Sequence, residues 1–230
     1  MKITTTKDYS ELSQLAAQSI LESVQANPSL FFCAATGGSP TGMYAEMAKH
    51  AADFVQMRVM KMDEWGIIHS EHPDSCESYL KQHVLTPLAV PATRYFGFDT
   101  HMADTDAECT RMQRVIAQEG PFDICILGLG KNGHIAFNEP AAFLNPSFHK
   151  ATLAPSTIQH DSSLSQGAEP AFGLCVGMEE ILQSKKIIFL VTGNGKEAAF
   201  KQIMTKQITT DCPASFLWLH PNVECYTTVS

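Results

Sequence analysis

The chain has 230 residues and a formal net charge of −8, from 16 Lys and Arg against 24 Asp and Glu. Hydrophobic residues make up 44% and charged residues 17%, a balance that excludes a disordered or fibrous chain. The negative charge argues against nucleic acid and membranes as partners, because phosphate backbones and anionic lipids repel an acidic surface. A small anionic substrate stays compatible, since it needs only a local positive potential.

The seven cysteines are odd in number, widely spaced and never arranged as C-x-x-C. This pattern favours buried, reduced thiols over disulfides or a zinc site. No apolar run approaches the roughly 20 residues that span a bilayer. The first residues lack the apolar core of a signal peptide. We therefore expect a cytoplasmic protein.

Helices and strands are expected to alternate along the chain. Asp8 is expected to cap the first helix, with Glu11 as its capping-box partner, and the pair Asn27-Pro28 to end it. The further expected helices are 43–52, 75–85, 104–118 and 197–204, and the expected strands are 30–35, 57–62, 95–98, 122–127, 185–191 and 215–219. Such alternation with apolar strands predicts one α/β domain, 1–230, with a mostly parallel sheet covered on both faces.

An open parallel sheet binds ligands beyond the carboxyl ends of its strands, so the turns that leave the strands carry the functional information. The first turn, 36–42, reads Thr-Gly-Gly-Ser-Pro-Thr-Gly. Its glycines allow backbone N–H groups to approach an anion, and a helix follows with its positive end. The alternative is a plain tight turn, because the pattern matches neither of the common phosphate-binding motifs.

Two further turns contain isolated charges. Asp63 and Glu64 follow an expected strand, where they suit either a general base or merely a helix cap or solvated pair. Lys196 opens an expected helix, although a cation there opposes the helix dipole. That cost indicates an anion nearby, and the alternative is an ordinary exposed lysine.

The turn 128–140 is rich in glycine and follows the expected strand 122–127 directly. It carries His134, a residue type able to shuttle protons, and Glu139, a carboxylate able to orient the imidazole. A purely structural histidine is the alternative. With no metal-ligand spacing in the chain, and with His69 and His72 interpreted as part of a loop, the four turns together indicate an enzyme that acts on a phosphorylated small molecule.

The four segments ATGGSPTGMY, KMDEW, GLGKNGHIAFNEP and LVTGNGKEAA closely resemble the glucosamine-6-phosphate deaminase family. The similarity extends over about 30–220. The segment ASFLWLH, and Asn132 in place of an aspartate, resemble the galactosamine-6-phosphate isomerase/deaminase branch. The resemblance implies a modified Rossmann-like fold, a three-layer α/β/α sandwich, and conversion of galactosamine 6-phosphate or glucosamine 6-phosphate to a ketohexose 6-phosphate and ammonia.

The resemblance also implies roles for single residues. Asp63 would move a proton between C2 and C1, His134 would open the sugar ring, and Glu139 would be the partner of His134. The phosphate would be bound by Gly37, Gly38, Ser39, Thr41 and Lys196. No organic cofactor or metal is implied, because a positioned carboxylate and imidazole suffice for general acid–base catalysis.

The chain departs from the family pattern at two places. Asn132 belongs to the catalytic turn, but it supplies no charge where these deaminases usually carry an aspartate. The arginine that they place on the phosphate has no match, since no arginine occurs in 151–173; His160 and Ser162 lie nearest to its position.

Two other functions compete with the deaminase. A 6-phosphogluconolactonase is a hydrolase of related fold, but its turn lacks the ending Asn138-Glu139-Pro140 and its reaction does not need Asp63 as a C–H base. A non-catalytic sugar-phosphate-sensing domain would usually be attached to a basic helix-turn-helix segment, and 1–29 contains none. The joint presence of Asp63, His134 and Glu139 also favours catalysis.

Overall fold

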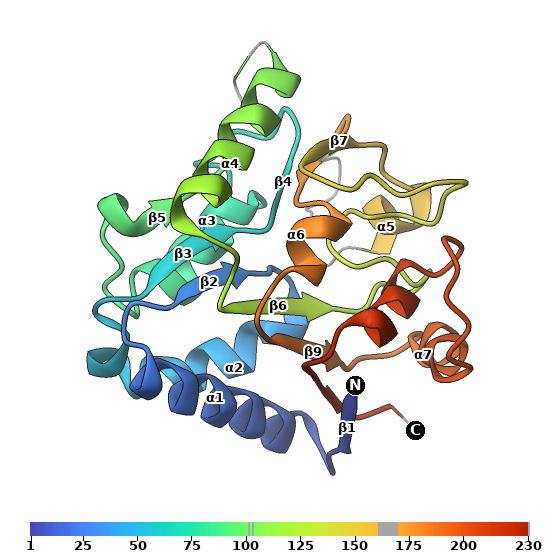
Figure 1. The fold of residues 1–230 in the computed structure, drawn as a ribbon, viewed down its shortest axis with the longest axis horizontal. Helices are drawn as coiled ribbons and strands as arrows, with labels where there is room; N and C mark the ends of the chain where they lie inside the picture. Colours follow the sequence, from blue (N-terminus) through green and yellow to red (C-terminus); the bar gives the residue numbers. More distant parts are fainter. Residues whose placement is uncertain (101, 103, 161–169, 230) are drawn as a thin grey trace.

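The computed structural model describes residues 1–100, 102, 104–160 and 170–229. A seven-stranded sheet, parallel at every pairing, forms the centre of this part of the chain (Figure 1). Its strand order is β1 (Lys2–Thr5), β10 (Val223–Thr227), β9 (Ile187–Val191), β6 (Ile124–Gly128), β2 (Phe31–Ala34), β3 (Arg58–Lys61) and β5 (Tyr95–Phe96). The parallel sheet predicted from the sequence is therefore confirmed.

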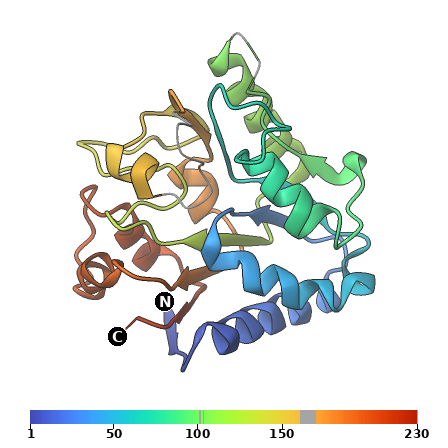
Figure 2. The same ribbon diagram turned by 180° about the vertical axis from the view of Figure 1, so that it is seen from behind.

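Helices cover both faces of this sheet (Figures 1 and 2). Along the chain, successive strands of this sheet are added in one direction up to β5 and in the opposite direction after it. Because crossovers between parallel strands are right-handed, the helices that precede β5 in the sequence lie on one face and those that follow it lie on the other. The first group is α1 (Tyr9–Ala26), α2 (Gly38–Ala48) and α3 (Cys76–Leu80), which continues as the π-helical turn Lys81–Leu85. The second group is α4 (Thr105–Glu119), α6 (Met178–Leu182) and α7 (Glu197–Met204). The result is the expected three-layer α/β/α sandwich.

The central strands are apolar along their whole length because both of their faces are covered. All residues of β2 and β9 are buried. Of the helices, α1 turns Leu12, Ala16 and Ile20 to the core. Its cap differs in one detail from the expected capping box: Asp8 accepts the Glu11 N–H at 2.8 Å, but the Glu11 carboxylate accepts the N–H of Lys7 at 2.7 Å.

The expected strand at 215–219 is wrong. Residues Pro213–Leu219 form a 3₁₀ helix, and the last strand, β10, follows it. The apolar run misled the prediction because a short run shows no period that separates a strand from a helix. Here Pro213 starts the helix, and the Trp218 indole donates a hydrogen bond of 2.8 Å to the Ile203 carbonyl.

A second, three-stranded sheet lies beside the first and was not expected from the sequence. It is antiparallel, in the order β4 (Asp63–Trp65), β8 (Gly173–Cys175) and β7 (His149–Ala151). The helix α2 also begins at Gly38, before the expected start at 43, because Gly37 makes the turn with a φ of +94°. Glycine adopts this backbone conformation without strain.

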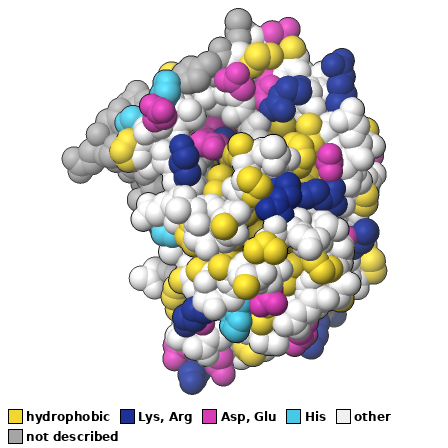
Figure 3. Space-filling view, turned by 90° about the vertical axis from the view of Figure 1, so that its left-hand side faces the viewer, with side chains coloured by type: hydrophobic (Ala, Val, Ile, Leu, Met, Phe, Trp, Pro, Cys, Tyr) yellow, Lys and Arg dark blue, Asp and Glu magenta, His cyan; other side chains and the backbone are white. Residues whose placement is uncertain are grey.

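The surface mixes charges of both signs. Figure 3 shows acidic and basic side chains interspersed over one face of the molecule. All seven cysteines are buried, as expected for structural thiols. No helix in the described part of the chain is long and apolar enough to cross a membrane.

A buried ionic cluster holds the end of β3 against α3. The Lys61 ammonium is fully buried, 2.7 Å from the Glu64 carboxylate and 2.8 Å from that of Glu77. Glu64 also accepts the backbone N–H groups of Trp65, Cys76 and Glu77. Burial alone would lower the pKa of Lys61, but the two carboxylates raise it above its ordinary value. The cluster therefore fixes the chain on both sides of residue 63.

We expect Lys61→Met to lower the free energy of unfolding by about 3–5 kcal/mol, because it leaves Glu64 buried without its cation. Urea unfolding measures this change. The matched control is Lys185→Met, which breaks an ion pair with Asp123 whose lysine is 65% exposed. Such pairs contribute about 0–1 kcal/mol. Equal losses in the two variants would contradict a structural role of the cluster.

Candidate active site

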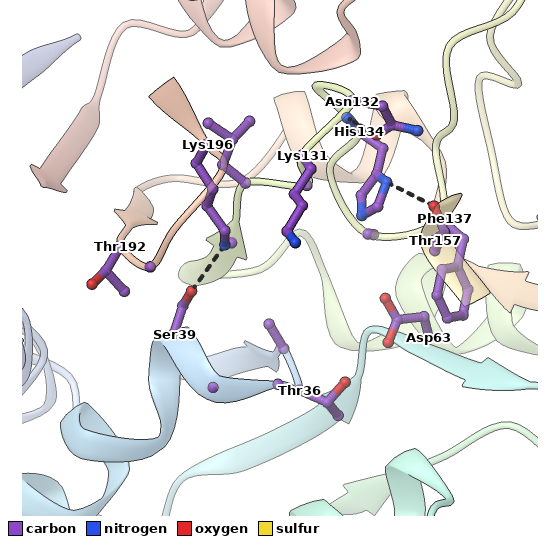
Figure 4. Close-up of a pocket in the computed structure, with 18 of the residues that line it drawn as sticks. Thr36, Ser39, Asp63, Lys131, Asn132, His134, Phe137, Thr157, Thr192 and Lys196 are labelled. Carbon is purple, nitrogen blue, oxygen red and sulfur yellow. Dashed lines mark hydrogen bonds between the residues drawn. The ribbon is translucent and has the colours of Figure 1, made fainter. Parts of the chain in front are cut away.

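A cavity of about 480 Å³ opens where β2, β3, β6 and β9 end (Figure 4). All four turns selected from the sequence contribute residues to its lining: 35–39 after β2, 62–63 after β3, 128–137 after β6 and 192–196 after β9. The strands β2 and β6 are neighbours in the sheet, although the chain leaves them in opposite directions. Such a switch of direction is where parallel α/β sheets form their ligand sites.

One side of the cavity is suited to an anion. Gly37, Gly38 and Ser39 lie at the N-terminal end of α2, where the helix dipole is positive. Lys196 reaches this end from the turn before α7, and its ammonium lies 3.4 Å from the Ser39 hydroxyl. Figure 4 shows the two side chains pointing toward one another, Lys196 from the turn before α7 and Ser39 from α2. The structure thus brings together residues that are far apart in the sequence.

Two tyrosines hold the loop that precedes α2. The Tyr9 hydroxyl donates to the Gly38 carbonyl at 2.7 Å, and the Tyr79 hydroxyl donates to the Gly37 carbonyl at 2.8 Å. The Thr41 hydroxyl also donates to the Gly37 carbonyl at 3.0 Å and lies 2.8 Å from the Tyr79 hydroxyl. Thr41 is not among the residues that line the cavity. Its contacts support the loop, in contrast to the phosphate contact implied for it by the resemblance.

Asp63 lies on the opposite side of the cavity. It is the first residue of β4 and only 6% exposed, yet it lines the cavity. The pairing of β4 with β8 sets Asp63 opposite Cys175, and the Cys76 thiol lies 3.9 Å from its Oδ1. Figure 4 shows its carboxylate facing the cavity below His134. The Asp63 carboxylate therefore borders the cavity although the residue is almost wholly shielded from bulk solvent.

His134 packs across the backbone of its own turn. A Cβ added to Gly130 would lie 2.4 Å from Cε1 and Nε2 of the imidazole, so this position requires glycine. Nδ1 lies 3.3 Å from Oε2 of Glu139 and 3.3 Å from the hydroxyl of Thr157. Thr157 donates in turn to Oε1 of Glu139 at 2.5 Å. The imidazole is oriented through Nδ1, and its other nitrogen faces the cavity (Figure 4).

Asn132 contacts the partner of His134 rather than its imidazole. Its Nδ2 donates to Oε2 of Glu139 at 2.8 Å, and its Oδ1 accepts the backbone N–H of His134 at 3.1 Å. An aspartate could accept the same N–H but could not donate to Glu139. Asn132 therefore acts as a hydrogen-bond donor to Glu139. The comparison with an aspartate, which concerned only charge, did not predict this role.

The Glu139 carboxyl is held in its ionised form. Burial alone would raise its pKa, but the hydrogen bond and the positive charge of His134, with hydrogen bonds from Thr157 and Asn132, lower the pKa to about 2. The carboxylate is thus available to stabilise a protonated imidazole throughout the neutral pH range.

Several residues that line the cavity were not predicted from the sequence. Tyr9, Lys131, Phe137 and Thr157 all border the cavity. Lys131 carried a usable signal, since it lies in a glycine-rich turn after a strand, as Lys196 does. Thr157 carried no such signal, because it reaches the cavity only through the fold of the chain between it and Glu139.

Ser162, one of the two candidates near the position of the missing arginine, lies outside the described residues, and so does the side chain of His160. Over the described ranges, no three His, Cys, Asp or Glu side chains are grouped to hold a metal ion.

We expect Glu139→Gln to make the free energy of unfolding depend less on pH below about pH 4.5. A carboxyl with a native pKa of about 2, against an ordinary 4.5, stabilises the fold above pH 4.5 and loses this contribution as the pH falls toward 2. Urea unfolding between pH 6 and 3 should therefore show the difference between wild type and variant shrinking with pH. The exposed Glu71→Gln serves as control. A constant difference would contradict the depressed pKa.

The chain is similar to known proteins over nearly its whole length. Residues 7–226 match the family model described as "Glucosamine-6-phosphate isomerases/6-phosphogluconolactonase". A glucosamine-6-phosphate deaminase of Lactobacillus delbrueckii subsp. bulgaricus is 35% identical over 225 residues, which are 97% of this chain and 94% of that protein. Glucosamine-6-phosphate deaminase 1 of Bacillus subtilis (strain 168) is 32% identical, over 97% of this chain and 95% of its own.

The solved structures agree with the sequence relatives. A monomeric glucosamine-6-phosphate deaminase superposes with a TM-score of 0.94 at 31% identity, covering 99% of this chain and 97% of its own. A 6-phosphogluconolactonase from Trypanosoma cruzi has a TM-score of 0.82, but its 18% identity, over 98% of this chain and 93% of its own, establishes only the shared fold. This chain belongs to the family of glucosamine-6-phosphate isomerases and 6-phosphogluconolactonases.

Proposed function

We propose that this protein is an amino-sugar-phosphate isomerase and deaminase. Its substrate would be galactosamine 6-phosphate or glucosamine 6-phosphate, and its products a ketohexose 6-phosphate and ammonia. One observation carries the proposal: a buried carboxylate, Asp63, and an oriented imidazole, His134, face a single cavity whose other end has Ser39 and Lys196. The deaminases among the relatives cover almost the whole chain.

The reaction would begin with opening of the pyranose. The C1–O5 bond breaks, the C1 hydroxyl loses its proton, and O5 gains one. His134 would transfer this proton through the nitrogen that faces the cavity, while Glu139 stabilises the protonated imidazole.

Asp63 would then carry the isomerisation. Its carboxylate takes the proton from C2 of the open-chain amino sugar while O1 gains a proton from solvent, which leaves an enolamine. Asp63 then returns its proton to C1. The nitrogen at C2 becomes an iminium, water adds to C2, and ammonia leaves. Asp63 suits this task because it is buried beside the cavity, where few water molecules compete for its lone pairs.

The phosphate would anchor the substrate at the other end of the cavity. The backbone N–H groups of Gly37 and Gly38, the Ser39 hydroxyl and the Lys196 ammonium supply donors of the kind that phosphate accepts. Because the phosphate does not react, its binding energy would serve to position C1 and C2 between Asp63 and His134.

The decisive experiment is an ammonia-release assay with glucosamine 6-phosphate and galactosamine 6-phosphate side by side. We expect release from at least one of them, and the ratio of the two rates identifies the preferred epimer at C4. Hydrolysis of 6-phosphogluconolactone without ammonia release would instead favour a lactonase. Binding of the sugar phosphates without any turnover would favour a sensing domain.

We expect Asp63→Asn to lower kcat by at least about 100-fold, because general-base catalysis contributes 10²–10⁴-fold. Exchange of solvent deuterium into C2 of the substrate should disappear with it. The urea midpoint of the variant shows whether the fold is retained. Exchange at the wild-type rate in a folded variant would contradict the assignment of Asp63 as the base.

A further inference from the structure

A second lysine points into the cavity beside Lys196. Lys131 lies in the turn after β6, and its side chain packs on the turn after β9: a Cβ added to Gly195 would lie 3.4 Å from its Cδ and Cε and 3.7 Å from its Nζ. Figure 4 shows Lys131 and Lys196 extending in the same direction, toward the level of Ser39. The stem of Lys131 is thus held by the turn that contains Lys196.

The two lysines differ in their surroundings. Lys196 contacts Ser39, whereas Lys131 is exposed at the cavity and, within the described residues, makes no hydrogen bond or ion pair. An ordinary surface lysine also lays its stem along the protein but keeps its charge in bulk solvent. Lys131 instead presents its charge to the space that the proposed substrate would occupy.

Charge balance argues for a second cation. A phosphate monoester carries about −1.5 to −2 at pH 7. Lys196 supplies one positive charge, and the end of α2 about half a charge. Asp63 lines the same cavity, and the whole chain carries −8, so the overall charge of the protein does not supply the missing positive potential.

The sequence has no lysine or arginine in the segment where the family's arginine would lie. No lysine or arginine occurs anywhere in 151–184, a range that includes all the undescribed residues 161–169. Among the described residues, Lys131 and Lys196 are the two lysine or arginine side chains that line the cavity.

We propose that Lys131 binds the substrate phosphate together with Lys196 and thereby replaces the missing arginine. Lys131 makes the site selective for phosphorylated sugars, because its ammonium neutralises charge that Lys196 and α2 leave uncompensated. The inference rests on the proposed function for the identity of the substrate as a sugar phosphate.

The test compares Lys131→Gln with Lys131→Arg and with the control Lys185→Gln. Lys185 is 65% exposed and precedes β9, at the opposite end of the sheet. We expect Lys131→Gln to raise KM for the hexosamine 6-phosphate by at least tenfold while kcat changes less than threefold. Lys131→Arg should restore most of the loss, and Lys185→Gln should match the wild type. Urea unfolding checks that each variant is folded.

Binding of inorganic phosphate, measured by calorimetric titration, separates this inference from the proposed function. Weaker phosphate binding by Lys131→Gln supports the inference even if the wild type releases no ammonia from either substrate. An active wild type whose KM and phosphate affinity are unchanged in Lys131→Gln overturns the inference and leaves the proposed function intact. A loss confined to kcat overturns it as well, because Lys131 would then act at the reacting carbons.

Discussion

The position of β6 between β2 and β9 decides where the polar side chains of the site lie. Its register pairs Cys125 with Cys33 on one side and Gly128 with Leu190 on the other, so the turns after all three strands emerge at one edge of the sheet. The turn after β3 joins them through the pairing of β3 with β2. Each turn contributes only one or two functional groups, and the parallel pairing of the strands brings these groups together in one cavity.

The resulting cavity has an uneven distribution of charge. Lys131 and Lys196 approach one end, while Asp63 and the His134–Glu139 pair occupy the other. The buried Lys61 cluster keeps the acidic end rigid, since it holds the strand that presents Asp63. For a substrate whose phosphate is on C6 and whose reacting carbons are C1 and C2, this separation would orient the sugar before any chemistry takes place.

Local signals were enough to predict the main strands and their turns, because apolar runs such as 122–127 and 185–191 end in glycine-rich segments. The three-residue strands of the second sheet were missed because each exists only through pairing with distant residues, as when Asp63 pairs with Cys175. The same limit applies to Thr157, whose contact with Glu139 depends on the course of the intervening chain. The role of Asn132 as a donor likewise requires the geometry, since its residue type alone specifies both a donor and an acceptor.

Asn132 is followed by Gly133, and asparagine is a chemically labile residue. Its spontaneous deamidation begins when the backbone nitrogen of the next residue attacks the side-chain amide carbon. That nitrogen, in Gly133, donates to the Gly130 carbonyl at 3.0 Å, and the amide of Asn132 is hydrogen-bonded at both of its ends. We expect these three hydrogen bonds to oppose the attack, because they hold both the Gly133 nitrogen and the Asn132 amide in place. Deamidation would turn the donor to Glu139 into a second carboxylate.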